Sequence, residues 1–223
     1  MNVTSLKTRQ QSRASSAARA PVREHYHHGD LPAALKRAAL TLIARHGVDG
    51  FSLREAAMAV GVSPSAAYRH FEDKAALLRA IAVDAFADLG QRFDAAMTSV
   101  RGASARAARA RFMGQGEAYV GFALEHPERF AVMFGPHGAG AYKAADCADA
   151  QPRSPYATLS RALDELTDTG VILPARRVDA ELLVWPAIHG LATLLVSGAI
   201  TPGPGGVTAM VRKIGEDCLR SLR

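Results

Sequence analysis

The sequence predicts an all-α protein of about nine helices in two domains, and three observations support this fold. Apolar side chains recur at helical spacing in each main segment. Capping serines and aspartates, with glycine or proline stops, divide these segments into helices. The charge is also uneven: residues 1–83 hold 12 Lys+Arg and 6 Asp+Glu, whereas residues 84–223 hold 15 of each. We expect a basic disordered arm at 1–28, a small domain at 29–87 and a larger domain at 88–223.

The small domain begins with a predicted helix that Asp30 caps and Gly47 ends. Its apolar face consists of side chains at helical spacing, namely Leu35, Ala38, Ala39, Leu42 and Ile43. We expect this face to pack behind the two short helices that follow and to close a three-helix unit.

Residues 51–74 predict two short helices joined by a tight turn. Ser52 and Glu55 form a capping box, and Gly61 ends the first helix because glycine enters the left-handed conformation without steric cost. Ser63 caps the second helix, whose first position is Pro64, and we expect about two turns that carry Tyr68, Arg69 and His70. Two such helices, with small alanines where they cross, predict a helix-turn-helix.

The second helix of this pair and its flanks present side chains that can donate to phosphates or reach base edges in a major groove. The candidate DNA-binding residues are Ser52, Arg54, Ser63, Pro64, Ser65, Ala66, Tyr68, Arg69, His70 and Lys74. The excess positive charge of the N-terminal part agrees with a phosphate-binding surface. The alternative is a plain helical hairpin with a solvated polar face.

This part of the chain resembles a known family. Phe51–Ala57, then Gly61-Val-Ser-Pro64, then Tyr68-Arg-His-Phe71 with Lys74, are similar to the DNA-binding domain of TetR-family transcriptional regulators, over about residues 31–87. The resemblance implies a homodimer that binds a palindromic operator in double-stranded DNA and releases it when a small molecule binds. Ala66 stands where the family often has Thr, and Ala67 where it often has Leu, so the operator sequence does not follow from the resemblance.

The N-terminal arm carries five basic residues and no acid before Glu24. It is interpreted as a disordered tail, with two alternatives: an arm that contacts phosphates or a minor groove, and an organelle transit peptide. The histidines at 25, 27 and 28, and the set His137, Asp146 and Cys147, are in no recognised metal spacing, so we expect no metal. Two distant cysteines and no secretory signal indicate a reducing, cytoplasmic setting.

The larger domain follows a long helix that Asp73 starts, of about 25 residues. After Gly102 we expect helices at 104–126 and 127–134, a loop at 135–152, and a helix from Ser154 to Gly170. Two further helices are expected at about 177–197 and 207–222. Leu182–Val211 contains no Asp, Glu, Lys or Arg, which raises the alternative of a membrane span. Its prolines, glycines and polar residues instead favour a helix buried by its own domain and by a second subunit.

Trp185 and His189-Gly190 resemble the Trp…His-Gly run of one C-terminal domain type of TetR regulators, over about residues 105–220. Trp185 and His189 share a helical face, which fits either core packing or a pocket wall with one polar tip. The candidate ligand-binding residues are aromatic and lie in this domain: Phe112, Tyr119, Phe122, Phe130, Phe134, Trp185 and His189.

No nucleotide-binding loop, nucleophile elbow or metalloprotease motif occurs in the sequence, so we expect no enzyme activity and no cofactor. The main hypothesis is a cytoplasmic, homodimeric transcriptional repressor. A small apolar or aromatic effector releases it from its operator. The alternative is a DNA-organising dimer without an effector. A solid C-terminal core favours the alternative, whereas a cavity with aromatic walls favours the effector.

Overall fold

The computed structural model describes residues 30–138, 141 and 154–223. This part of the chain contains nine α-helices and one short 3₁₀ helix, and it confirms the predicted all-helical fold. The helices are α1 (Leu31–His46), α2 (Leu53–Val60), α3 (Pro64–Tyr68), α4 (Lys74–Ser99), α5 (Ala105–Glu125), α6 (Pro127–Phe134), α8 (Pro155–Asp168), η1 (Pro174–Arg176), α9 (Glu181–Val196) and α10 (Gly206–Ser221). The arm at 1–28 and most of the loop at 135–152, including Asp146 and Cys147, lie outside the described residues.

Helices α1, α2 and α3 form the three-helix unit that the sequence predicts. The Ser52 side chain accepts from Glu55 N, and the Glu55 carboxylate accepts from Ser52 N at 2.7 Å, which completes the capping box. Gly61 has φ +79° and ends α2. Ser63 caps α3. The predicted length of α3 was wrong, because α3 has only five residues and Arg69 is its C-cap.

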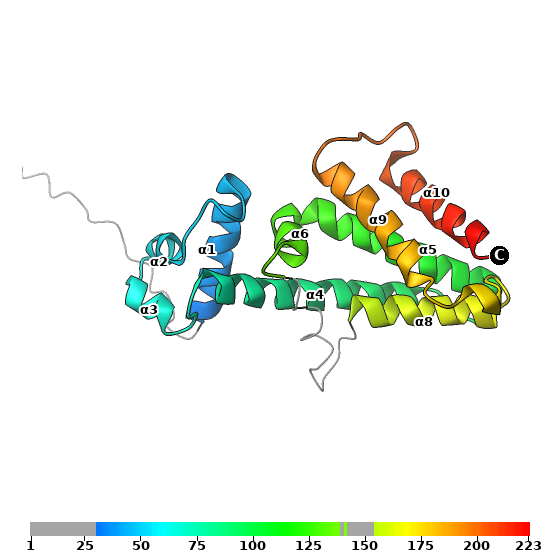
Figure 1. The fold of residues 1–223 in the computed structure, drawn as a ribbon, viewed down its shortest axis with the longest axis horizontal. Helices are drawn as coiled ribbons and strands as arrows, with labels where there is room; N and C mark the ends of the chain where they lie inside the picture. The colour runs from blue at the N-terminus through cyan, green and yellow to red at the C-terminus, as the bar shows by residue number, and fades with distance from the viewer. Residues whose placement is uncertain (1–29, 139–140, 142–153) are drawn as a thin grey trace, which may run out of the picture. The chain divides into compact units, whose positions relative to one another are not determined.

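Helix α4 belongs to both halves of the fold. Its 26 residues begin at the predicted cap, where Asp73 accepts from Ala76 N. It contacts α1 and also packs against α5, α6 and α8, and Figure 1 shows it leading from the helix-turn-helix to the C-terminal helices. Residues 31–223 accordingly cluster as one compact unit, and the division at residue 87 falls inside α4.

The uncharged segment 182–211 contains all of α9 except its first residue, Glu181, and continues into the first residues of α10. Helix α9 begins four residues later than predicted. The 3₁₀ turn η1 precedes it, and Asp179 with φ +56° separates the two. Pro186 lies inside α9, and Leu191, Ala192 and Leu195 are buried in the core. Within the described residues, no helix has the length and hydropathy needed to cross a membrane.

Candidate functional site

The helix-turn-helix exposes most of the predicted DNA-binding side chains. Arg54, Ser65, Tyr68, Arg69 and His70 are exposed, and Tyr68 retains 52% of its accessible surface. On the opposite side, Ala56, Ala57 and Ala67 are fully buried, so small side chains hold the two short helices close together. The buried Ala67 also marks the position where the family often has a larger side chain.

The two capping serines differ in what they can offer a phosphate. Ser52 Oγ donates to Glu55 Oε2 at 2.8 Å, so its only hydroxyl hydrogen serves the capping box. This hydrogen bond is the main cause that lowers the pKa of Glu55. Ser63 Oγ only accepts, from Ala66 N at 3.3 Å, and its hydroxyl hydrogen stays available for another acceptor. Ser63 is therefore a better candidate than Ser52 for a phosphate contact.

Lys74 is tied to the loop that precedes α2. Its Nζ donates to the Asp49 carbonyl at 3.1 Å and lies 4.6 Å from the centre of the Phe51 ring. An ammonium has three donor hydrogens, so this bond leaves two for a phosphate. Lys74 thus has a structural task in addition to the DNA contact predicted for it.

The C-terminal helices enclose a cavity with apolar walls. The cavity has a volume of about 60 Å³ and opens to the solvent. Six helices supply its walls: α4, α5, α6, α8, α9 and α10. None of the lining residues in the described part of the chain carries a charged side chain.

Four of the seven predicted ligand-binding residues lie in this wall and three do not. Phe112, Tyr119, Phe134 and Trp185 line the cavity. Phe130 is buried behind it and stacks on His189, with 5.4 Å between ring centroids. Phe122 lies 5.3 Å from the Arg92 guanidinium and 5.4 Å from that of Arg129, so it packs under cations instead. We therefore remove Phe122, Phe130 and His189 from the predicted lining, while the ligand-binding role of the other four stays a prediction.

Tyr119 connects the cavity wall to His189. Its hydroxyl lies 2.8 Å from His189 Nδ1, and Trp185 Nε1 donates to it at 3.4 Å. Burial raises the pKa of Tyr119 and lowers the pKa of His189. Both pKa shifts favour the neutral side chains, so the Tyr119 hydroxyl donates to Nδ1 of a neutral His189. Both interpretations of the Trp185 and His189 pair thus hold in part, since Trp185 lines the cavity and His189 is hydrogen-bonded inside.

The sequence-based prediction missed several residues of the cavity wall, because it considered only aromatic side chains of the C-terminal domain. They include polar, apolar and α4 residues: Phe86, Leu89, Phe93, Gln115, Tyr156, Leu159, Ile188 and Cys218. Gln115 lies between Phe112 and Tyr119 at three- and four-residue spacing, so the helical period of α5 was the signal that could have found it.

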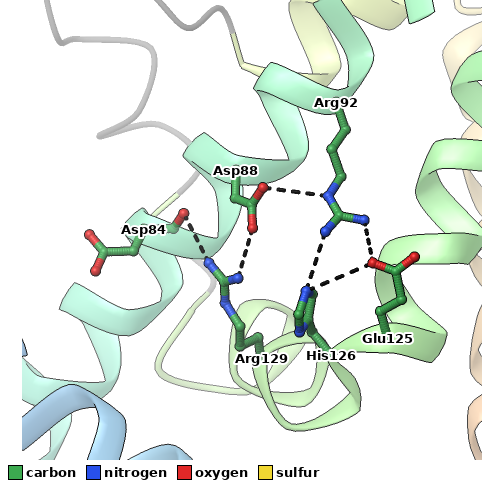
Figure 2. Close-up of polar contacts among 6 residues, drawn as sticks. All are labelled: Asp84, Asp88, Arg92, Glu125, His126 and Arg129. Atoms are coloured by element: carbon green, nitrogen blue, oxygen red, sulfur yellow. Dashed lines mark hydrogen bonds and ion pairs between the residues drawn. The ribbon is translucent and has the colours of Figure 1, made fainter. Parts of the chain in front are cut away.

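A network of charged side chains attaches the junction of α5 and α6 to α4 (Figure 2). Arg92 Nη1 donates to Glu125 Oε2 at 2.8 Å, and Arg129 Nη1 donates to Asp88 Oδ2 at 2.7 Å. Arg92 also lies 3.3 Å from His126 Nε2. On the neighbouring turn of α4, Asp84 pairs with Lys36 of α1. Helix α4 is therefore linked to α1 and to the α5–α6 junction on adjacent turns.

No group of three or more metal-binding side chains occurs among the residues that the structure describes. Of the set His137, Asp146 and Cys147, only His137 is described. Cys218 is buried in the cavity wall, and burial is the main cause that raises the pKa of its thiol. The cysteine is therefore a neutral apolar neighbour for a ligand.

An exposed helix-turn-helix joined by one long helix to a second helical domain is the architecture of a DNA-binding regulator. Sequence comparison agrees in both halves. Residues 35–81 match the profile of the bacterial regulatory proteins of the tetR family, and residues 112–215 match that of the tetracyclin repressor-like C-terminal domain. No curated protein sequence matches the chain.

Solved structures match over nearly the whole chain. A protein with unknown function from Rhodococcus sp. RHA1 is 31% identical, covers 89% of this chain and 98% of its own, and has a TM-score of 0.72. A regulatory protein of the tetR family from Rhodococcus RHA1 is 22% identical, covers 86% and 96%, and has a TM-score of 0.63. RolR, solved in complex with resorcinol, is 21% identical, covers 86% of both chains, and has a TM-score of 0.58.

The chain belongs to the TetR family and is a DNA-binding transcriptional regulator. The family is not enzymatic, so the predicted lack of enzyme activity agrees with this assignment. The C-terminal match spans Trp185, His189 and Gly190 but does not distinguish the Trp…His-Gly type, which stays a prediction.

Proposed function

We propose that this regulator is a cytoplasmic, homodimeric repressor that leaves a palindromic operator when a small apolar or aromatic molecule enters the C-terminal cavity. The observation that carries the proposal is the cavity itself, whose walls are aromatic and uncharged. Small-molecule sites in proteins are concave and mostly apolar, with a few polar groups that orient the ligand. RolR, which shares the fold, was solved with the aromatic molecule resorcinol, and this supports an aromatic effector.

An exposed apolar face of α9 supports the dimer. Leu182 retains 68% of its accessible surface, Leu183 39% and Leu194 45%, on a helix whose opposite face is buried. Pro186 and Thr193 extend this face, and charged residues are lacking from the whole segment 182–211. Apolar surface of this kind is typical of subunit interfaces. We define this α9 face as Leu182, Leu183, Pro186, Thr193 and Leu194.

The DNA surface in this proposal is the outer side of α3 with its flanks. Arg69, His70 and Tyr68 contact phosphates or base edges, and Arg54 and Lys74 contact phosphates from α2 and α4. Ser63 offers a hydroxyl donor, whereas Ser52, Pro64, Ser65 and Ala66 place the backbone of the two helices near the duplex. Each protomer supplies one short helix, so the dimer is needed for a specific site.

Helix α4 is the proposed route from cavity to DNA. Phe86, Leu89 and Phe93 of α4 line the cavity, and Asp84 and Asp88 hold α1 and α6. A ligand that separates the walls shifts α4 and with it the distance between the two helix-turn-helix units. Half-sites lie one helical turn of DNA apart, ~34 Å, or a multiple of it, so a small shift lowers operator affinity.

The alternative of an effector-independent DNA organiser requires a solid C-terminal core. The cavity disfavours it, because burying so many aromatic side chains around an unfilled space gives up packing contacts that a purely structural core would make.

Selection of binding sites from a random pool of duplex DNA tests the proposal. We expect an inverted repeat, bound by a dimer, and release by an aromatic compound that enters the cavity. A selected site without two-fold symmetry would contradict the dimeric mode, and an operator complex that no cavity ligand weakens would favour the organiser.

A further inference from the structure

One of the buried polar atoms that lack a hydrogen-bond partner belongs to a residue of the cavity wall. Within the described residues, three buried side-chain atoms have no hydrogen-bond partner: Gln115 Oε1, Thr158 Oγ1 and Arg161 Nε. Thr158 and Arg161 share a face of α8, and Gln115 of α5 donates through Nε2 to the Thr158 carbonyl. Of these three residues, Gln115 belongs to the cavity wall.

The orientation of the Gln115 carboxamide follows from its neighbour. The Thr158 carbonyl is only an acceptor, so the amide nitrogen must face it, and the amide oxygen must be the unpaired atom. Gln115 is 2% exposed, and a buried carbonyl oxygen without a donor is unfavourable. The bond that holds the amide is long, 3.4 Å, so turning the group toward the cavity sacrifices little.

The other polar groups of the wall are already engaged or weak. The Tyr119 hydroxyl is shared between His189 and Trp185. Cys218 is a neutral thiol, which is a poor donor and acceptor. The acceptor that most lacks a partner is therefore Gln115 Oε1, and the unmatched chemistry at the wall is that of a hydrogen-bond donor.

We propose that Gln115 is a specificity-determining residue, which selects a neutral, mostly apolar effector carrying one hydroxyl donor, such as a phenol or an alcohol. This inference rests on the proposed function, since it names the chemistry of the molecule that the cavity takes. A carboxylate is disfavoured, because it brings only acceptors and a negative charge to a wall that has no cation among the described lining residues.

Trp185 provides the readout, since it is the only tryptophan of the chain and lines the cavity. We would titrate the wild-type protein with para-butylphenol, its methyl ether and para-butylbenzoate, and follow the fluorescence of Trp185. We expect the phenol to bind about tenfold more tightly than the ether, and the benzoate to bind most weakly, because only the phenol satisfies the Gln115 oxygen.

Two variants assign the preference to one side chain. Gln115→Met keeps the length of the side chain without the amide, and we expect it to abolish the preference for the phenol while the ether binds as before. Tyr119→Phe tests the other polar group of the wall, whose hydroxyl bonds to His189. Gln91→Met, the same replacement at an exposed position of α4, is the matched control and should keep the preference.

The outcomes separate the role of Gln115 from the role of the cavity as an effector site. Equal affinity of phenol and ether for the wild-type protein would overturn the role of Gln115 and leave the cavity as an effector site. Loss of the preference in Tyr119→Phe, with Gln115→Met unchanged, would assign it to Tyr119 instead. A benzoate that binds more tightly than the phenol would refute a neutral ligand. No response of Trp185 to any of the three would remove both this inference and the proposed cavity ligand.

Discussion

The helix-turn-helix and the C-terminal cavity present opposite kinds of surface. The first exposes Arg54, Tyr68, Arg69 and His70 around a core of small buried alanines. The second turns large aromatic side chains inward around an uncharged space. The first surface suits a highly charged polymer, and the second suits a neutral small molecule. Helix α4 contacts both regions, through α1 and through α5, α6 and α8.

The largest expected effect comes from a charge placed at either of two neighbouring residues of α9, one buried and one exposed. Leu195 is 8% exposed and Leu194 is 45% exposed. We expect Leu195→Arg to unfold or aggregate the protein, because an unpaired buried charge costs several kcal/mol. Leu194→Arg should instead give folded monomers that lose operator binding, as seen by circular dichroism, light scattering and DNA binding. Gln91→Arg, on an exposed position of α4, is the control for added charge. A Leu194→Arg monomer that still binds the operator tightly would refute the dimeric mode.

The next effect concerns the basic arm, which stays a sequence-based prediction. Deleting residues 1–24 should leave folding and dimerisation unchanged, because the segment contains too few large apolar side chains to build a core. Its five basic residues should add DNA affinity that falls as salt rises. Fluorescence anisotropy at low and high salt measures this, and equal affinities at low salt would show an arm that does not touch DNA.

A smaller effect distinguishes two cations of the DNA surface. The DNA affinity falls as salt rises, and Arg69→Ala and Lys74→Ala should each reduce the steepness of log K against log salt by about one. Lys74→Ala should also lower the melting temperature, because its bond to Asp49 and its contact with Phe51 are lost. Lys213→Ala, exposed on α10, should change neither quantity. An unchanged slope for Lys74→Ala would leave Lys74 a structural role only.

Tyr68→Phe should weaken DNA binding to a similar extent on all sequences, because a phosphate contact by the tyrosine hydroxyl carries no sequence information. Competition binding with operator and unrelated duplexes measures this. A loss confined to the operator would instead indicate that Tyr68 reads a base edge.

The smallest effect is a pH dependence in the cavity region. Burial lowers the pKa of His189 below its ordinary 6.5, so the unfolded chain binds the proton more readily than the folded one. The stability is therefore complete above about pH 6.5 and decreases as the pH falls through that value. His189→Gln should flatten the melting temperature between pH 7 and pH 5. A steeper decrease in the variant would contradict a neutral His189.

The two regions also differ in how far the sequence alone predicts them. The helix-turn-helix depends on local features, such as the Ser52–Glu55 box and Gly61, so its caps and turn could be predicted residue by residue. The exception was α3, which ends at Tyr68 with Arg69 as its C-cap, while the amides of His70 and Phe71 both donate to the Ala67 carbonyl. No local pattern marked this early end.

The cavity depends on contacts between helices that are distant in the chain. Phe112 and Phe122 lie on the same helix and look equally suitable, yet one lines the cavity and the other packs under Arg92 and Arg129. That difference is set by α4 and α6, whose positions no motif specifies. Gln115 was missed for another reason: its spacing on α5 was visible, but the candidates were chosen among aromatic side chains, and its unpaired oxygen becomes apparent only in the fold.

Reciprocal binding tests the central claim, the coupling of cavity and operator, most directly. The affinity of para-butylphenol would be measured from Trp185 fluorescence with and without a saturating operator duplex, and the operator affinity with and without the phenol. Coupling requires both affinities to fall by the same factor, about 5- to 150-fold for typical coupling energies. A phenol that fills the cavity and leaves the operator affinity unchanged would contradict it.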